Sequence, residues 1–417
     1  MPSVEMHRER GTSTGAALVC FQVVSKDSMK IEMRYDMLHH TDRKRIFWLD
    51  VARTAALWSI CLCHAVDQVW QVFGDKQHQD FLETTLRSSV LEAFLCAFGR
   101  IGVPLFLMIT GALLLRREFR TTEDIFGFYK KNLLPLVITT EIWYVIIFWQ
   151  IVFSSRSNYW LLNYSVPSLF RMMGKTMLLT DVLSHGHMWY MPMIFCTYLV
   201  LPFVAILLTK VELKALVPLG TAIVIVSFLV PNAGTILSLH GDVQTPFTFE
   251  MQPAWLVSWY VLYTVIGYWI SGGGLQKVRN LYVWIVFVLS VCATAGMQFY
   301  SFTKDLQNVS PYVLNYNFIG ILTMGAAGFE LLRRGAGRLR RFAPQFAYMS
   351  RTAFAIYLLH RVILDVMVKK LLYPVYHTWS RPLTCAAFVV IPIAASLLVI
   401  APLSKIPFFK RYVFLIK

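Results

Sequence analysis

The amino-acid sequence predicts an all-α, polytopic membrane protein: a bundle of about ten transmembrane helices with both termini in the cytoplasm. The 417-residue chain is 57% apolar and only 15% charged, whereas soluble domains are nearer 45–50% apolar and about 25% charged. Apolar runs long enough to cross a hydrocarbon core of about 30 Å recur along the whole chain. The number of Lys and Arg residues also alternates between high and low in successive connections between these runs.

The apolar runs predict ten membrane spans. They lie at approximately residues 47–70, 93–115, 133–154, 188–209, 213–231, 253–271, 281–301, 312–332, 346–369 and 382–404. The first run contains charged residues and would score poorly on hydropathy alone. We include it because of the pattern that these charges form, described below.

The positive charge is concentrated on one side of the predicted bundle. The net charge is +16, which in a soluble chain would suggest a nucleic-acid partner. Here the ten spans gather 26 Lys and Arg residues on one side and only 9 in the opposite loops. Basic residues mark the cytoplasmic side of membrane proteins. Both termini are therefore expected in the cytoplasm, with membrane lipid as a partner and no nucleic acid.

One integral domain, residues 45–417, is expected. Residues 1–44 are expected to be a cytoplasmic tail, either disordered or the result of a start codon assigned too early. The outer loop 232–252 has no Lys or Arg and should fold over the outer mouth of the bundle.

The seven cysteines lie almost entirely in apolar runs and form no C-x-x-C pair, so neither a disulfide framework nor a metal site is indicated.

The first span contains ionisable residues that suggest a functional site. It reads LDVARTAALWSICLCHAVD (49–67), and ionisable residues at membrane depth are functional candidates because they are costly to bury there. Eleven residues turn a helix through about 1100°, close to three full turns, and rise about 16 Å. Arg53 and His64 should therefore share one face. Asp50 and Asp67 each lie three residues away from one of them, within contact distance on a helix.

This geometry suits a long substrate with an anionic head near the cytoplasm and a reactive tip deep in the bilayer. Acyl-coenzyme A has that form. Arg53 would hold its phosphates through charge-assisted hydrogen bonds, and His64 would act as general base beside the thioester, with Asp67 orienting its ring. The structural alternative is that Arg53 extends to the interface and pairs with Asp50, while His64 is a satisfied core histidine.

Other polar residues lie at membrane depth or at the outer ends of spans. Arg100 is flanked by Gly99 and Gly102, which leave room for a ligand or a neighbouring helix; the alternative is an interfacial anchor. The segment SHGHMWYMP (184–192) combines histidines with aromatic rings, as sugar-binding sites do, although Trp and Tyr also favour the membrane interface. The remaining candidates are His187, Trp189, Tyr190, Glu141, Tyr357 and His360.

Four motifs, taken in order, resemble the acyltransferase-3 family of integral membrane acyltransferases. They are L-D-x-x-R followed after ten residues by His (49–64), R-x-G-V-P-L-F-x-x-x-x-G (100–111), H-M-W-Y-M-P (187–192) and S-x-x-x-x-x-I-Y-L-L-H (350–360). The resemblance covers roughly residues 45–405. The V-P-L-F sequence is similar to the branch that includes the enterobacterial common antigen O-acetyltransferase.

The resemblance implies an enzyme of the bacterial inner membrane. Such enzymes transfer an acyl group, usually acetyl, from cytoplasmic acyl-coenzyme A to a carbohydrate hydroxyl, typically of a surface polysaccharide or its lipid-linked precursor. The family's arginine–histidine pair corresponds to Arg53 and His64. Acetyl-coenzyme A is then expected as a co-substrate, with no permanently bound cofactor.

The expected site has three parts. His64 and Asp67 are the expected catalytic residues, either as a general base or, for His64, as a carrier of the acyl group. The expected donor-binding residues are Arg53, Asp50, Lys130 and Lys131. The expected acceptor or oxyanion side comprises Arg100, His187, Trp189, Tyr190, Glu141, Tyr357 and His360.

Two alternatives stay open at this point. A transporter or proton-coupled permease would use His64, Glu141 and His360 as a proton relay, although the sequence shows no internal symmetry of the kind that many transporters have. The other alternative is a succinyl or longer-chain donor within the same family, because the width of the pocket is not readable from the sequence.

Overall fold

The computed structural model describes the chain in eight stretches, residues 45–73, 86–154, 165–177, 186–211, 213–233, 259–303, 315–367 and 379–416. The predicted N-terminal tail and almost all of the loop 232–252 lie outside the described residues. The chain divides into two units, Met1–Ile46 and Phe47–Lys417, and the second contains every helix described below.

Every regular element in the described residues is a helix, and each of the ten predicted spans contains described helical residues. These are α2 (Phe47–Phe73); α4 (Leu86–Gly99) with α5 (Gly102–Leu114); α6 (Thr122–Phe128), η1 (Tyr129–Leu133) and α7 (Leu134–Ser154); η2 (Gly186–Trp189) with α10 (Tyr190–Lys210); η3 (Leu213–Leu216), α11 (Val217–Val224) and η4 (Ile225–Leu229); α13 (Trp259–Ser271); α14 (Asn280–Thr303); α16 (Ile319–Gly335); α17 (Ala343–Met367); and α18 (Arg381–Leu403). Shorter helices are α9 (Val166–Met177), η6 (Ala336–Phe342) and η9 (Phe409–Val413).

Seven helical segments of the described chain are long and apolar enough to cross a membrane. They are α2, α4 with α5, α6 to α7, η2 with α10, η3 to η4, α14 and α18. The described parts of α13 and α16 have only 13 and 17 residues, and α17 carries charged and polar residues of the site described below. The protein is therefore a multi-pass membrane protein. The count of ten spans and the cytoplasmic location of the termini stay predictions.

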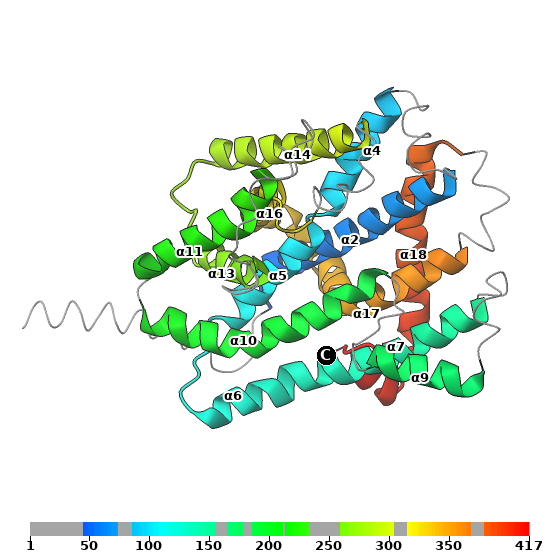
Figure 1. Cartoon of the computed structure of the whole chain (residues 1–417). Coiled ribbons are helices and arrows are strands. Elements are labelled where there is room, and N and C mark those ends of the chain that lie inside the picture. The colour runs from blue at the N-terminus through cyan, green and yellow to red at the C-terminus, as the bar shows by residue number, and fades with distance from the viewer. Residues whose placement is uncertain are drawn as a thin grey trace, which may run out of the picture. The chain divides into compact units, whose positions relative to one another are not determined.

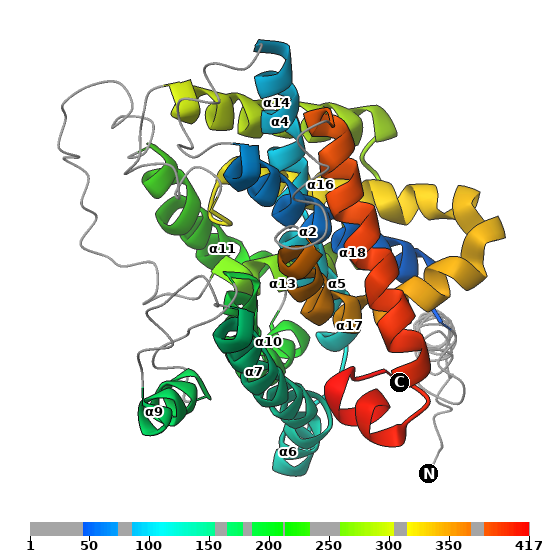
Figure 2. The same ribbon diagram turned by 90° about the vertical axis from the view of Figure 1, so that its right-hand side faces the viewer.

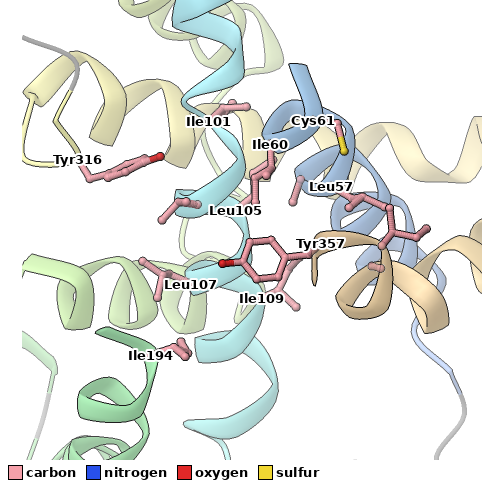
Figure 3. Close-up of a cluster of buried hydrophobic side chains, with 14 of the residues drawn as sticks. Leu57, Ile60, Cys61, Ile101, Leu105, Leu107, Ile109, Ile194, Tyr316 and Tyr357 are labelled. Carbon is pink, nitrogen blue, oxygen red and sulfur yellow. The ribbon is translucent and has the colours of Figure 1, made fainter. Parts of the chain in front are cut away.

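Helix α2 is surrounded by other helices of its unit. It packs against α4, α5, α16, α17 and α18 (Figures 1 and 2). Its residues Ala52, Ala56 and Ala65 are all 0% exposed, and small side chains of this kind let membrane helices approach closely. Larger buried side chains such as Leu57 pack in the same apolar cluster as Leu105 of α5 (Figure 3). The predicted first span is thus an inner helix despite its charges.

The second predicted span is broken into α4 and α5 at Arg100. A Cβ atom added at Gly99 would lie 2.7 Å from the Cα atom of Cys63, and one added at Gly102 would lie 2.7 Å from the backbone oxygen of Ala56. Both glycines therefore allow α2 to approach the break closely. This confirms the prediction that the glycines around Arg100 make room for a neighbouring helix.

The C-terminal segment is attached to α7 by two hydrogen bonds. The Thr139 hydroxyl donates to the backbone oxygen of Tyr412 at 2.6 Å, and the Trp143 indole N–H donates to that of Val413 at 2.8 Å. Val413 itself is buried. The bonds fix the end of the described chain against the helix that carries Glu141.

A buried carboxylate joins the end of α16 to the segment after α13. Glu330 is 0% exposed and accepts hydrogen bonds from Arg333 at 2.7 and 2.8 Å and from Arg334 at 2.5 Å. Arg334 also donates to the backbone oxygens of Leu275 and Val278. This network holds the segment that follows α13 against the C-terminal end of α16.

Candidate active site

Three histidines from distant parts of the sequence meet beside the second half of α2. They are His64 of α2, His187 of η2 and His360 of α17. The ring centroids are 5.3 Å apart for His64 and His360, 5.6 Å for His187 and His360, and 6.1 Å for His64 and His187. The sequence predicted each of them as a site residue, and the fold brings them into one cluster.

Arg53 and His64 lie on the same face of α2, as their spacing predicted. The Arg53 Nη1 atom donates to the Ser350 hydroxyl at 2.8 Å, and Ser350 is on α17. His64 contacts His360, which is also on α17. Since α2 and α17 pack side by side, both residues face α17. Eleven residues of helix separate them by about 16 Å along the axis.

His64 is the most exposed ring of the cluster. Its side chain is 16% exposed, whereas His187 and His360 are 2% and 1% exposed. Of the three imidazoles, His64 is therefore the one that a substrate can reach with the least rearrangement.

His360 is held in one tautomer by its own helix. Its Nδ1 atom lies 2.7 Å from the backbone oxygen of Tyr357 and 3.1 Å from that of Ile356. A carbonyl oxygen only accepts hydrogen bonds, so Nδ1 carries the ring proton. The Nε2 atom is buried and has no hydrogen-bond partner.

The two aspartates of the predicted site differ in their surroundings. The Asp67 Oδ2 atom lies 3.9 Å from His64 Nδ1, which is too long for a hydrogen bond but close enough to interact with a protonated ring. Asp50 is 4% exposed and lies one turn before Arg53. The orienting role of Asp67 and the donor-binding role of Asp50 stay predictions.

Two arginines lie near His64. Arg100 and Arg361 are both close enough to interact electrostatically with it. Arg361 forms an ion pair with Asp365 (Nε to Oδ1, 3.2 Å) and donates to Gln68 at 3.4 Å. Arg361 and Gln68 were not among the predicted site residues. The signal for Arg361 was available, because it is a charged residue within a predicted span and follows His360 directly.

Arg100 faces the same region from the break between α4 and α5. It interacts with Asp67 and with the Tyr316 hydroxyl, and its Nε atom is buried without a hydrogen-bond partner. Figure 3 shows the Tyr316 hydroxyl directed toward α5. Nothing in the sequence singled out Tyr316, which lies just before α16.

Tyr357 connects two members of the histidine cluster. Its hydroxyl donates to the backbone oxygen of His187 at 2.6 Å, and its ring centroid lies 5.4 Å from that of His187 and 6.1 Å from that of His360. The hydroxyl proton is used within the protein, so in this arrangement Tyr357 positions His187 and does not donate to an oxyanion.

Aromatic rings continue from the cluster. Trp189 is 37% exposed and stacks on Tyr316, with centroids 5.4 Å apart and an interplanar angle of 27°. Tyr260 lies 6.1 Å from Trp189. Tyr190 is half-buried and contacts Tyr357 edge-on at 5.8 Å. The proposed contact of Trp189 and Tyr190 with an acceptor stays a prediction.

The remaining predicted residues lie on the segment from α6 to α7. Glu141 is half-buried, and its Oε2 atom has no hydrogen-bond partner. One turn later the Tyr144 hydroxyl is also buried without a partner. Lys130 and Lys131 are exposed on the π-helical turn η1. Their roles stay predictions. Among the described residues, no group of His, Cys, Asp and Glu could hold a metal ion.

A buried cluster of histidines and arginines inside a membrane-spanning bundle is the arrangement of an intramembrane enzyme or of a proton-coupled transporter. Comparison with known families distinguishes the two. The acyltransferase-3 family model, described as an acyltransferase domain, matches residues 46–401, so the chain belongs to this family and is a membrane acyltransferase. No curated protein and no solved structure matches the chain.

Proposed function

We propose that the protein is an O-acyltransferase of the bacterial inner membrane. It moves an acetyl group from cytoplasmic acetyl-coenzyme A to a hydroxyl of a surface polysaccharide or its lipid-linked precursor. The observation that carries the proposal is the placement of Arg53 and His64 on one face of α2. The rings of His187 and His360 lie beside His64. The V-P-L-F sequence of α5 favours the branch that resembles the enterobacterial common antigen O-acetyltransferase.

The donor end of the proposed site is Arg53. The guanidinium carries five N–H donors, and the bond to Ser350 fixes its orientation. A phosphate that accepts from this group gains about 1.5–3 kcal/mol from the charged hydrogen bond. Lys130 and Lys131 add exposed positive charge on η1, and Asp50 lies one turn before Arg53. The pantetheine arm of the donor would then extend along α2 toward His64.

The chemical end of the proposed site is His64. The acceptor oxygen attacks the thioester carbon while His64 takes the hydroxyl proton; the C–S bond then breaks and the thiolate takes up a proton. In the second route, His64 first carries the acyl group itself, and the acceptor attacks that acyl-imidazole. In both routes Arg100 and Arg361 supply positive charge beside His64, which favours the oxyanion that forms at the acyl carbon.

The acceptor is proposed to approach from the side of His187, Trp189 and Tyr190, with Glu141 as a further polar contact. Family membership does not favour the transporter alternative. A succinyl or longer-chain donor would use the same residues, so the donor must be tested directly.

The test uses inverted membrane vesicles, in which the cytoplasmic face is exposed. Acetyl-coenzyme A labelled in its acetyl group is added outside, and the label is followed into glycan and glycolipid. A parallel series uses succinyl-coenzyme A labelled in its succinyl group. His64→Ala is compared with Trp58→Leu, because Trp58 lies on the same helix and is 41% exposed. We expect wild type and Trp58→Leu to transfer label. His64→Ala should transfer it at least about 100-fold more slowly.

The outcomes separate the alternatives. Label transfer only from succinyl-coenzyme A would replace the acetyl donor. Transfer by His64→Ala at the wild-type rate would exclude His64 as the catalytic group. If wild type and all variants transfer no label from either donor, the acyltransferase proposal as stated is wrong.

A further inference from the structure

The unpaired Nε2 atom of His360 has no role in the steps above. Hydrogen bonds from Nδ1 to the helix backbone fix the proton on that side of the ring, so Nε2 of the neutral ring is a lone-pair acceptor. It is buried and has no hydrogen-bond partner. A buried polar atom left unpaired costs about 1–3 kcal/mol, and native proteins rarely leave one without a reason.

The ring closest to His360 in the cluster is His64. Their centroids are 5.3 Å apart and the rings are tilted by 37°, whereas His187 is 5.6 Å from His360 and nearly perpendicular to it, at 71°. An N–H···N bond of about 2.9 Å places two imidazole centroids about 5 Å apart. The separation of the two ring centroids therefore allows an N–H···N hydrogen bond between His64 and His360.

We propose that Nε2 of His360 accepts the proton that His64 gives up during acyl transfer. The proposal rests on the proposed function and deepens it, because it holds for both routes. When His64 takes the acceptor proton at one ring nitrogen, the proton on its other nitrogen passes to His360. The acceptor oxygen then bonds to the acyl carbon, the C–S bond breaks, and the proton returns through His64 to the thiolate.

The same transfer serves the acyl-imidazole route. One nitrogen of His64 bonds to the acyl carbon, the C–S bond breaks, and the proton on the other nitrogen passes to His360, which holds it. When the acceptor oxygen attacks the acyl carbon, the bond from that carbon to His64 breaks, the proton returns from His360 to His64, and the hydroxyl proton of the acceptor goes to the thiolate. His360 touches no substrate in either route, so it is a positioning and proton-accepting residue for His64.

The charges around the pair suit a transient transfer. Arg100 and Arg361 lie near His64, and Arg361 and Asp365 lie near His360. Arg361 is paired with Asp365, and Arg100 interacts with Asp67, so each arginine has a carboxylate nearby. A further proton on the two histidines is then a net charge in a buried region, which is costly to keep. The thiolate is then the final acceptor of the proton, as coenzyme A requires.

The test is His360→Asn in the vesicle assay. The Asn side-chain amide N–H can replace Nδ1–H as a donor to the Tyr357 carbonyl, but it offers no basic nitrogen in place of Nε2. We expect kcat to fall about 100-fold, with the donor KM and the detergent melting temperature unchanged. A purely structural role predicts that this variant keeps the wild-type kcat, and that result would overturn the proposal.

Chemical rescue keeps the proposal testable if His360→Asn folds poorly. In His360→Ala, imidazole added to the assay should raise kcat at least about 10-fold. Failure of imidazole to raise the rate of a folded His360→Ala protein would overturn the proposal. The proposed function has its own readout, which is label transfer by wild type and by His64→Ala. Transfer by wild type, loss of transfer in His64→Ala and full activity of His360→Asn would together reject the His360 proposal alone.

Discussion

Replacing Gly102 with alanine should push the break at Arg100 away from α2. The added Cβ atom would lie 2.7 Å from the backbone oxygen of Ala56 and 2.7 Å from the Cγ1 atom of Ile60, whereas ordinary contacts begin at 3.4 Å. Relieving both contacts requires the two helices to separate by about 0.7 Å, because close-packed interiors have no space to absorb a methyl group.

The separation has a cost in stability and in activity. Overpacking of this kind typically costs about 1–3 kcal/mol, which in a chain of this length corresponds to a fall in melting temperature of about 1–3 °C. Arg100 lies two residues before Gly102, the first residue of α5, and would move with the break. A misplacement of about 1 Å near an active site can cost about 100-fold in rate, so we expect acyl transfer to fall about 10-fold or more.

The control for Gly102→Ala is Gly296→Ala on α14, where an added Cβ atom meets nothing within 4 Å. Alanine in a helix interior is favoured over glycine by about 0.5–1 kcal/mol, so this variant should melt at or above the wild-type temperature and keep full activity. Both variants are purified in detergent, melted, and assayed for label transfer. If Gly102→Ala matches Gly296→Ala in both measurements, the close approach of α2 and α5 does not position Arg100.

Three further predictions concern single hydrogen-bonding groups. Ser350→Ala removes one hydrogen-bond partner of Arg53 and should raise the donor KM about 5-fold with kcat within about 2-fold; an unchanged KM in a donor titration would show that the bond does not hold Arg53 for binding. Tyr357→Phe removes the 2.6 Å bond to the His187 backbone and should lower stability by about 1 kcal/mol and reduce kcat; a variant with wild-type melting and kcat contradicts the positioning role. Glu330→Gln weakens the three bonds from Arg333 and Arg334 and should cost about 2 kcal/mol, seen as a lower melting temperature with an unchanged donor KM; unchanged melting would mean that the network does not stabilise the fold.

The shared face of Arg53 and His64 was predictable because helix geometry alone fixes it. Both residues belong to one continuous helix, and three turns separate them whatever the rest of the fold does. The room around Arg100 was predictable for a similar reason, because glycines on both sides of a charged residue indicate close approach. Each of these inferences used only local spacing.

The meeting of the three histidines was not predictable from spacing. His64, His187 and His360 lie on different helices, and many pairings of apolar helices satisfy the same hydropathy. The sequence also placed Tyr357 on the acceptor side, but it could not show that the His187 backbone takes up its hydroxyl proton. Tyr316 gave no signal because it lies outside the motifs and reaches Arg100 only through the tertiary fold.

The most direct test of the central claim is a titration of acetyl-coenzyme A in inverted vesicles that carry wild type, Arg53→Ala or His64→Ala at matched expression. If α2 holds the donor at one end and performs the chemistry at the other, Arg53→Ala should raise the donor KM about 10- to 100-fold and retain transfer at saturating donor. His64→Ala should lower transfer at least about 100-fold at every donor concentration. Transfer by His64→Ala at the wild-type rate, or loss of maximal rate in Arg53→Ala without any change in KM, would contradict this division of roles.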